Sequence, residues 1–178
     1  MVICIIVIVL SVVLDQLTKL IVVNSLELHE SVEVIPNIFN FTYIRNNGAA
    51  FGMLGEHRWI FMVVSSVAIL GILVYLFKFA PKNKLLRVGL SLVVGGGIGN
   101  MIDRIALGYV VDFLDFCAFD FWIWIFNVAD ACVCVGAGIV ALYFIIDIIR
   151  EAKENKLKNT IEAGLEQEIK EEKNEENE

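Results

Sequence analysis

The chain has 178 residues, of which 58% are hydrophobic and 20% are charged. Soluble domains are typically roughly 45 to 50% apolar, so this composition excludes an ordinary water-soluble domain and favours a membrane protein. The net charge of −7 is unevenly distributed, because residues 151–178 hold ten Glu and five Lys and the first 150 residues carry only −2. Nucleic acid binding needs a clustered basic face, so a nucleic-acid partner is disfavoured.

Four apolar runs are candidates for membrane spans, each of which needs about 20 apolar residues. They cover residues 2–23, 59–77, 85–102 and 126–146. We therefore expect an all-α membrane protein, a four-transmembrane-helix bundle, with one domain over 1–150 and an acidic tail over 151–178. The tail suits a marginal amphipathic helix or a disordered segment, because apolar residues recur every four positions, at Leu157, Ile161, Leu165 and Ile169.

Basic residues gather at two places beside these spans, and they predict the orientation of the chain. They lie between the second and third spans and after the fourth, at Lys78, Lys82, Lys84, Arg87, Arg150, Lys153, Lys156 and Lys158. Lys and Arg concentrate on the cytoplasmic side of a membrane. We therefore expect both termini to be cytoplasmic and the connections 24–58 and 103–125 to lie on the outer face.

A β-rich element is predicted in the first outer connection. Residues 39–53 alternate aromatic and β-branched side chains and contain Asn47-Gly48, a dipeptide typical of tight hairpin turns. We expect a small β-rich element on the outer membrane surface.

Ionisable side chains in a span are costly unless paired, so each is a candidate functional residue. Asp15 and Lys19 lie four residues apart in the first span, in the order that favours an ion pair within a helix. We expect this pair mainly to position the first span. In the third span, Gly95 and Gly99 have the GxxxG spacing that lets another helix approach closely.

Polar residues follow these glycines as the third span ends. Asn100 and Asp103 are three residues apart and can share a helix face, and Arg104 lies one turn from Asn100. A capping and ion-pairing cluster explains these three residues about as well as catalysis does.

Two further carboxylates are harder to explain by packing. Asp112 lies in an apolar, strand-like stretch without a basic neighbour, and Asp130 lies three residues after Asn127, which can cap the fourth span. If both meet in a poorly solvated cleft, one keeps a proton near neutral pH while the other stays ionised. Such a pair suits an aspartic protease, in which the ionised member activates water and the protonated member donates to the peptide carbonyl. Pairing with Arg or Lys at the membrane interface is the alternative.

Other protease mechanisms fit the sequence less well. His29 and His57 lie outside any HExxH pattern, and the four cysteines form no CxxC pair, so we expect no metal site. Ser11 lies eight residues from Lys19, too far along a helix for a Ser-Lys dyad.

Five ordered motifs now make the chain resemble a known family, the bacterial lipoprotein signal peptidases, also called signal peptidase II. The motifs are DQLTK at 15–19, NNGAAF at 46–51, GNMIDR at 99–104, GYVVDF at 108–113 and FNVAD at 126–130. The family comprises aspartic intramembrane proteases with four spans, and the resemblance covers nearly the whole membrane portion of the chain.

The resemblance implies roles for these residues. Asp112 and Asp130 match the catalytic pair, and the matching residues that line, brace or support the active site are Asp15, Lys19, Asn46, Gly48, Asn100, Asp103, Arg104 and Asn127. It implies no cofactor, a location in the bacterial cytoplasmic membrane with the active site near the outer face, and a monomer in contact with membrane lipid. The implied substrate is a prolipoprotein with a diacylglyceryl-modified cysteine, cleaved just before that cysteine.

Two non-enzymatic alternatives remain, a small membrane transporter and a lipoprotein-binding assembly factor. A transporter should carry polar residues across the bilayer, whereas the acids here stop in the outer third of the spans. An assembly factor that only binds lipoproteins should tolerate the loss of either Asp112 or Asp130.

Overall fold

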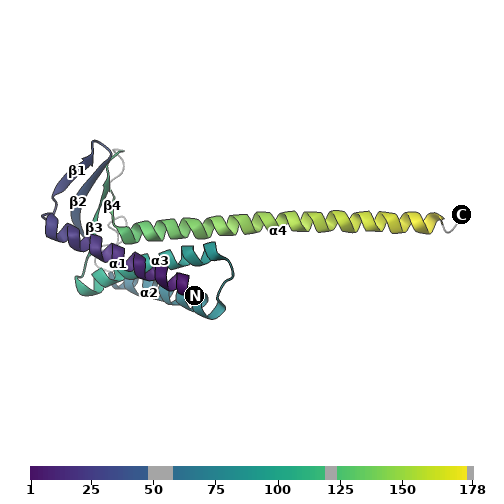
Figure 1. The fold of residues 1–178 in the computed structure, drawn as a ribbon, viewed down its shortest axis with the longest axis horizontal. Helices are drawn as coiled ribbons and strands as arrows, with labels where there is room; N and C mark the ends of the chain where they lie inside the picture. The colour runs from purple at the N-terminus through teal and green to yellow at the C-terminus, as the bar shows by residue number, and fades with distance from the viewer. Residues whose placement is uncertain (48–57, 119–123, 176–178) are drawn as a thin grey trace. The chain divides into compact units, whose positions relative to one another are not determined.

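The structure, a computed structural model, describes residues 1–47, 58–118 and 124–175 (Figure 1). Four of its helices are long and apolar enough to cross a membrane. The helices are α1 (Val2–Ser25), α2 (Arg58–Val74) with the π-helical turn η2 (Tyr75–Phe79), α3 (Lys84–Ala106) and α4 (Val128–Glu175). The chain divides into two compact units, Met1–Val140 and Ala141–Glu178. The predicted helical membrane protein is confirmed.

The ends of two helices differ from the sequence-based expectation. The side chain of Asn83 caps α3, because its Oδ1 accepts hydrogen bonds from the backbone N–H groups of Leu85 and Leu86 at 2.8 and 3.1 Å. The helix then runs 23 residues to Ala106, so the third span is longer than residues 85–102. Helix α4 begins at Val128, directly after the predicted cap Asn127 and two residues after the approximate start of the apolar run, because Ile125–Phe126 forms a strand.

The tail is helical in this structure. Of the two alternatives that its four-residue spacing left open, the helix is the one observed, because α4 continues to Glu175. Leu157 and Ile161 are both exposed along it.

The small β-rich element is a four-stranded sheet with the order β1-β2-β3-β4, and every neighbouring pair is antiparallel. Its strands are β1 (Ser31–Ile35), β2 (Phe39–Asn46), β3 (Val110–Phe116) and β4 (Ile125–Phe126). Figure 1 shows them side by side at one end of α1 and α3. A turn joins β1 to β2 with Asn37 at a φ of 58°, whereas Gly48 of the predicted hairpin turn lies outside the described residues.

One face of the sheet packs against α1, and the other face carries Asp112. Tyr43, Val111 and Phe113 pack with Val22 from the end of α1, so this face fixes the sheet to the helices. Successive side chains of a strand point to opposite faces, so Asp112 faces away from this apolar cluster. The sheet therefore presents Asp112 on the face that the α1 contact leaves free.

Helix α3 is the central helix, and its glycines allow the close packing. A Cβ added at Gly95 would lie 2.6 Å from the Cβ of Ser11 on α1, and one at Gly99 would lie 2.5 Å from Oδ2 of Asp15. A Cβ at Gly96 would collide with the carbonyl oxygen of Ala129 on α4. The close approach that the GxxxG spacing predicts is therefore confirmed, with α1 as the partner.

Candidate active site

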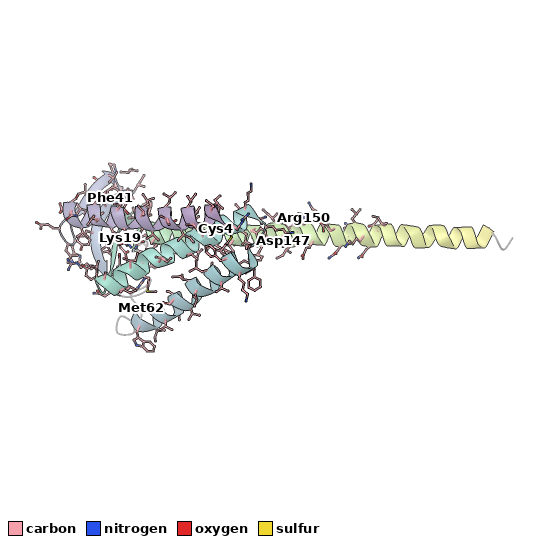
Figure 2. The ribbon with its side chains drawn as sticks, turned by 60° about the horizontal axis from the view of Figure 1, so that its bottom comes forward. Cys4, Lys19, Phe41, Met62, Asp147 and Arg150 are labelled. Atoms are coloured by element: carbon pink, nitrogen blue, oxygen red, sulfur yellow. The ribbon has the colours of Figure 1, made fainter. Side chains whose placement is uncertain are left out.

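A buried ion cluster joins α1 to α3 near the sheet. The Nζ atom of Lys19 lies 2.9 Å from Oδ2 of Asp15 and 3.0 Å from Oδ2 of Asp103. The exposed fractions of Lys19, Asp15 and Asp103 are 3%, 0% and 3%. Figure 2 shows Lys19 at the opposite end of α1 from Cys4. The predicted pair on α1 is confirmed, and Asp103 adds a second carboxylate from another helix.

The two carboxylates of this cluster also hold the backbone of neighbouring elements. Asp15 Oδ1 accepts a hydrogen bond from the N–H of Ala129 at the start of α4, at 2.9 Å. Asp103 Oδ2 accepts one from the N–H of Val111 in β3, at 3.0 Å. The ion cluster therefore fixes the two segments that carry Asp130 and Asp112.

Gln16 is a participant that the sequence reasoning missed. Its Nε2 donates to Asp103 Oδ1 at 2.9 Å and to the carbonyl oxygen of Gly99 at 3.2 Å. The available signal was an amide side chain directly beside Asp15 within an apolar span.

Asn100 connects the ion cluster to Asp130. Its Oδ1 accepts from Lys19 Nζ at 3.1 Å and from Asn127 Nδ2 at 3.0 Å. Its Nδ2 donates to Asp130 Oδ1 at 2.7 Å. The residue thus uses both ends of its amide within the buried network.

Asn127 and Asp130 form the predicted cap of α4. Asn127 Oδ1 accepts from the N–H of Asp130 at 2.8 Å, and Asp130 Oδ2 accepts from the N–H of Asn127 at 3.2 Å. This reciprocal pattern is a capping box with an Asp at the third helical position. It holds the Asp130 side chain against the start of the helix.

Asp112 is brought to the same site from β3. Its Oδ1 accepts from Asn127 Nδ2 at 2.6 Å, and its Oδ2 accepts from Asn46 Nδ2 at 2.8 Å. Burial raises the pKa of Asp112 to about 7, and the nearby charge of Asp130 adds to the rise, whereas the two amide donors oppose it. Such a carboxyl retains a proton close to neutral pH.

The two carboxyl groups therefore share a neighbour. Asn127 donates through Nδ2 to Asp112, and it exchanges two hydrogen bonds with Asp130. Within the part of the chain that the structure describes, no hydrogen bond joins the two carboxyls directly. Asn127 links them, because its side-chain Nδ2 donates to the Asp112 carboxyl and its backbone N–H donates to the Asp130 carboxyl.

Arg104 does not take part in the expected ion pairing. Its Nη1 donates to the backbone carbonyl oxygen of Asn100 at 3.2 Å. Among the described residues, no carboxylate lies within ion-pair distance of Arg104. Of the alternatives left open for Asn100, Asp103 and Arg104, ion pairing is observed for Asp103, and its partner is Lys19 across the helix interface.

Two further expectations concern this site. Gly48 lies outside the described residues, so its position relative to Asp112 stays a prediction. Over residues 1–47, 58–118 and 124–175, no three His, Cys, Asp or Glu side chains gather where they could hold a metal ion.

Comparisons with known proteins agree on one family. The family model described as "Signal peptidase (SPase) II" matches residues 7–146. A lipoprotein signal peptidase of Symbiobacterium thermophilum is 49% identical over 138 residues, which cover 78% of this chain and 91% of that protein. One of Brevibacillus brevis is 43% identical over 143 residues, covering 80% and 92%.

Solved structures agree with this result. One bacterial membrane enzyme superposes with a TM-score of 0.76 at 34% identity, covering 82% of this chain and 88% of its own. A second has a TM-score of 0.73 at 35% identity, covering 79% and 91%. Together with four apolar helices and the sheet, these matches confirm the resemblance that the five motifs carry. The chain belongs to the signal peptidase II family and is a bacterial membrane peptidase.

Proposed function

We propose that the chain is an aspartic endopeptidase that removes signal peptides from diacylglyceryl-modified prolipoproteins. It cleaves the peptide bond just before the lipidated cysteine. The observation that carries the proposal is the placement of Asp112 and Asp130 on either side of Asn127, in a buried network that both main-chain segments enter. The relatives are named lipoprotein signal peptidases, which supports the same substrate class.

The reaction needs one ionised and one protonated carboxyl. The ionised member takes a proton from water, whose oxygen bonds to the peptide carbonyl carbon, and the protonated member gives its proton to the carbonyl oxygen. The resulting diol collapses when the peptide nitrogen receives the proton taken from water and the C–N bond breaks. A hydroxyl proton then returns to the second carboxyl, so the pair ends as it began. The raised pKa of Asp112 supports this division, because it keeps one carboxyl protonated near neutral pH.

The other motif residues are proposed to support this pair. Asn46, Asn100 and Asn127 orient the carboxyls through the hydrogen bonds described above. Asp15, Lys19 and Asp103 hold the elements in place. For Arg104 and Gly48, the proposed supporting role rests on their motifs alone.

We propose the topology that the distribution of basic residues predicts. Both termini are cytoplasmic, and the sheet and the carboxyl pair lie near the outer face of the cytoplasmic membrane. The outer faces of the helices are rich in exposed apolar residues, such as Leu10, Val67 and Leu70, as contact with lipid requires. We propose that the chain works as a monomer embedded in lipid.

The test is cleavage of a diacylglyceryl-modified precursor by the purified full chain in detergent micelles. Asp112→Asn and Asp130→Asn should each lower kcat by about 100-fold to 10,000-fold, because each removes one proton-transfer group. Asp115→Asn is the matched control on the same strand, where Asp115 accepts a hydrogen bond from Thr42 Oγ1 at 2.7 Å. It should retain activity.

Three outcomes would contradict the proposal. Retained cleavage by either Asp112→Asn or Asp130→Asn would exclude the carboxyl pair as the catalytic groups. Precursor binding by the unmodified chain without any cleavage would instead favour the lipoprotein-binding assembly factor. Cleavage should also persist in the presence of a chelator, and its loss would favour a metal-dependent mechanism.

A further inference from the structure

The two carboxyls of the site are held by different kinds of donors. Asp130 accepts from the amide of Asn100 and from a backbone N–H at the start of α4. Asp112 accepts only from the side-chain amides of Asn127 and Asn46 among the hydrogen bonds described. A helix N-terminus favours negative charge, so the backbone of α4 itself stabilises an anion at Asp130.

The Asn100 amide adds to this difference because it contacts both Lys19 and Asp130. Its Oδ1 accepts from the Lys19 ammonium at 3.1 Å while its Nδ2 donates to Asp130 at 2.7 Å. An amide turned the other way would place an NH₂ group against the ammonium and an oxygen against the carboxylate. The cation therefore fixes the orientation of the Asn100 amide. It also polarises the N–H group that this amide donates to Asp130.

Lys19 is fully engaged in this arrangement. Its ammonium has three hydrogens, and the three acceptors within reach are Asp15 Oδ2, Asp103 Oδ2 and Asn100 Oδ1. Among the described residues, the charges of Lys19 and Asp15 on α1 act on the pair, and Asp103 on α3 contacts Lys19. Lys19 forms ion pairs with the two carboxylates in direct contact with it, and it donates its third hydrogen to Asn100, whose amide in turn donates to Asp130.

We propose that Lys19 is a positioning residue that acts through Asn100 to keep Asp130 ionised, which leaves the shared proton on Asp112. This inference rests on the proposed function and adds the assignment of roles within it. Asp130 takes the proton from water, and the water oxygen forms the new C–O bond. Asp112 gives its proton to the carbonyl oxygen, Asp130 returns the water proton to the leaving nitrogen, and Asp112 regains a proton as the diol collapses.

The assignment predicts which limb of the pH profile each variant moves. With Asp130 as the base, the acidic limb of kcat/KM reports Asp130 and the alkaline limb reports Asp112. Asn100→Ala removes a donor to the anion of Asp130, so the acidic limb should move to higher pH by about one unit. Below that limb, the rate should fall about tenfold further than in the unmodified chain.

Asn46→Ala is the matched variant on the other carboxyl. It removes a donor to Asp112, so the alkaline limb should move to higher pH while the acidic limb stays in place. If the roles are reversed, Asn100→Ala moves the alkaline limb and Asn46→Ala moves the acidic limb. That crossed result, or an unchanged acidic limb in Asn100→Ala, overturns the inference.

Lys19→Met removes the cation that acts on Asp130 through Asn100. It should shift the acidic limb to higher pH by at least as much as Asn100→Ala does, and a change in kcat without a shift of the limb overturns a role for Lys19. Asn100→Ala leaves the Lys19 ion pairs with Asp15 and Asp103 intact, so the inference stays testable if Lys19→Met does not fold. Failure of the proposed function is distinguishable, because it appears as retained cleavage in Asp112→Asn or Asp130→Asn.

Discussion

Helices α2 and α3 are both membrane spans, but they lie in opposite surroundings. Of the most apolar 18-residue window of α3, 44% is buried inside the structure, against 6% for the span Met62–Phe79 that α2 forms with η2. The more apolar of the two is α2, and its side chains are mostly exposed, as in Val67 and Leu70. The buried helix α3 instead carries Ser91, Asn100 and Asp103 among its buried residues.

The difference shows that apolar character and structural importance run in opposite directions in this bundle. Lipid is the solvent for α2, so a uniform apolar surface suffices there. Neighbouring helices surround α3, and helix association inside a membrane depends on close packing and polar contacts. The helix that a hydropathy scan ranks lower is therefore the one that organises the site.

The largest effect should come from breaking the ion cluster between α1 and α3. Lys19→Met leaves Asp15 and Asp103 buried without their cation, so we expect a loss of about 3 to 5 kcal/mol in the free energy of unfolding. Lys78→Met is the control, because Lys78 is exposed at the end of the α2 segment and should change stability by less than about 0.5 kcal/mol. Thermal unfolding in micelles measures both, and equal effects would remove the contrast between the two helices.

The pH dependence of stability should come from Asp112 on β3, the strand that follows α3. The pKa of Asp112 is about 7 in the folded chain, against 3.8 for an unperturbed carboxyl. The folded state therefore binds more protons between these values, so the free energy of unfolding should fall by about 2 to 4 kcal/mol as pH rises from about 4 to about 7. The contribution becomes constant about one pH unit above the folded pKa, where Asp112 is deprotonated in both states.

Asp112→Asn should flatten that slope, and Asp115→Asn should preserve it. Helix α2 provides no comparable response, because residues 59–77 contain no Asp, Glu, Lys, Arg or His. Denaturation followed at several pH values gives the slope. An unchanged slope in Asp112→Asn would show that another group carries the pH dependence.

A smaller effect should come from adding a methyl group where helices touch. Gly96→Ala places a Cβ against the carbonyl oxygen of Ala129, so we expect a loss of about 1 to 3 kcal/mol through overpacking. Gly71→Ala on α2 has no atom within 4 Å of the added Cβ and should be neutral or slightly stabilising. Unfolding temperatures of the two variants compare the interfaces, and a stable Gly96→Ala would mean that α3 and α4 can separate at little cost.

The smallest effect concerns two valines. Val94 on α3 has no exposed surface, whereas 67% of Val67 on α2 is exposed. Val94→Ala should cost about 1 to 2 kcal/mol through the cavity it leaves, and Val67→Ala should change stability by less than about 0.5 kcal/mol. Denaturant titration of both variants would sharpen the comparison, and similar losses would show that lipid contacts stabilise α2 as well as protein contacts stabilise α3.

The sequence predicts the parts of this molecule that depend on local pattern. Long apolar runs locate the helices, and the spacing of Asn127 and Asp130 predicts the capping box that the structure contains. The apolar isolation of Asp112 and Asp130 identifies both as candidates. Each of these signals lies within one short segment, which is where periodicity and capping rules apply.

What the sequence does not predict depends on contacts between segments. The partner of Asp103 is Lys19, 84 positions earlier in the chain, and not the adjacent Arg104. Strands β1 and β4 were not predicted, because β1 is exposed throughout and β4 has only two residues. A polar residue such as Gln16 is common near a membrane interface, so its presence alone predicts no contact. Its hydrogen bond to Asp103 is visible only in the packed helices.

The hydrogen bond between Asp15 and the N–H of Ala129 joins the first helix of the chain to the start of the last. During synthesis, α1 leaves the ribosome before α4, so Asp15 cannot form its hydrogen bond with Ala129 until α4 has been made. Asp130 contacts Asn100, and through it is linked to Lys19, only once α4 has packed against α3. A nascent or truncated chain that lacks α4 therefore has no assembled pair of Asp112 and Asp130.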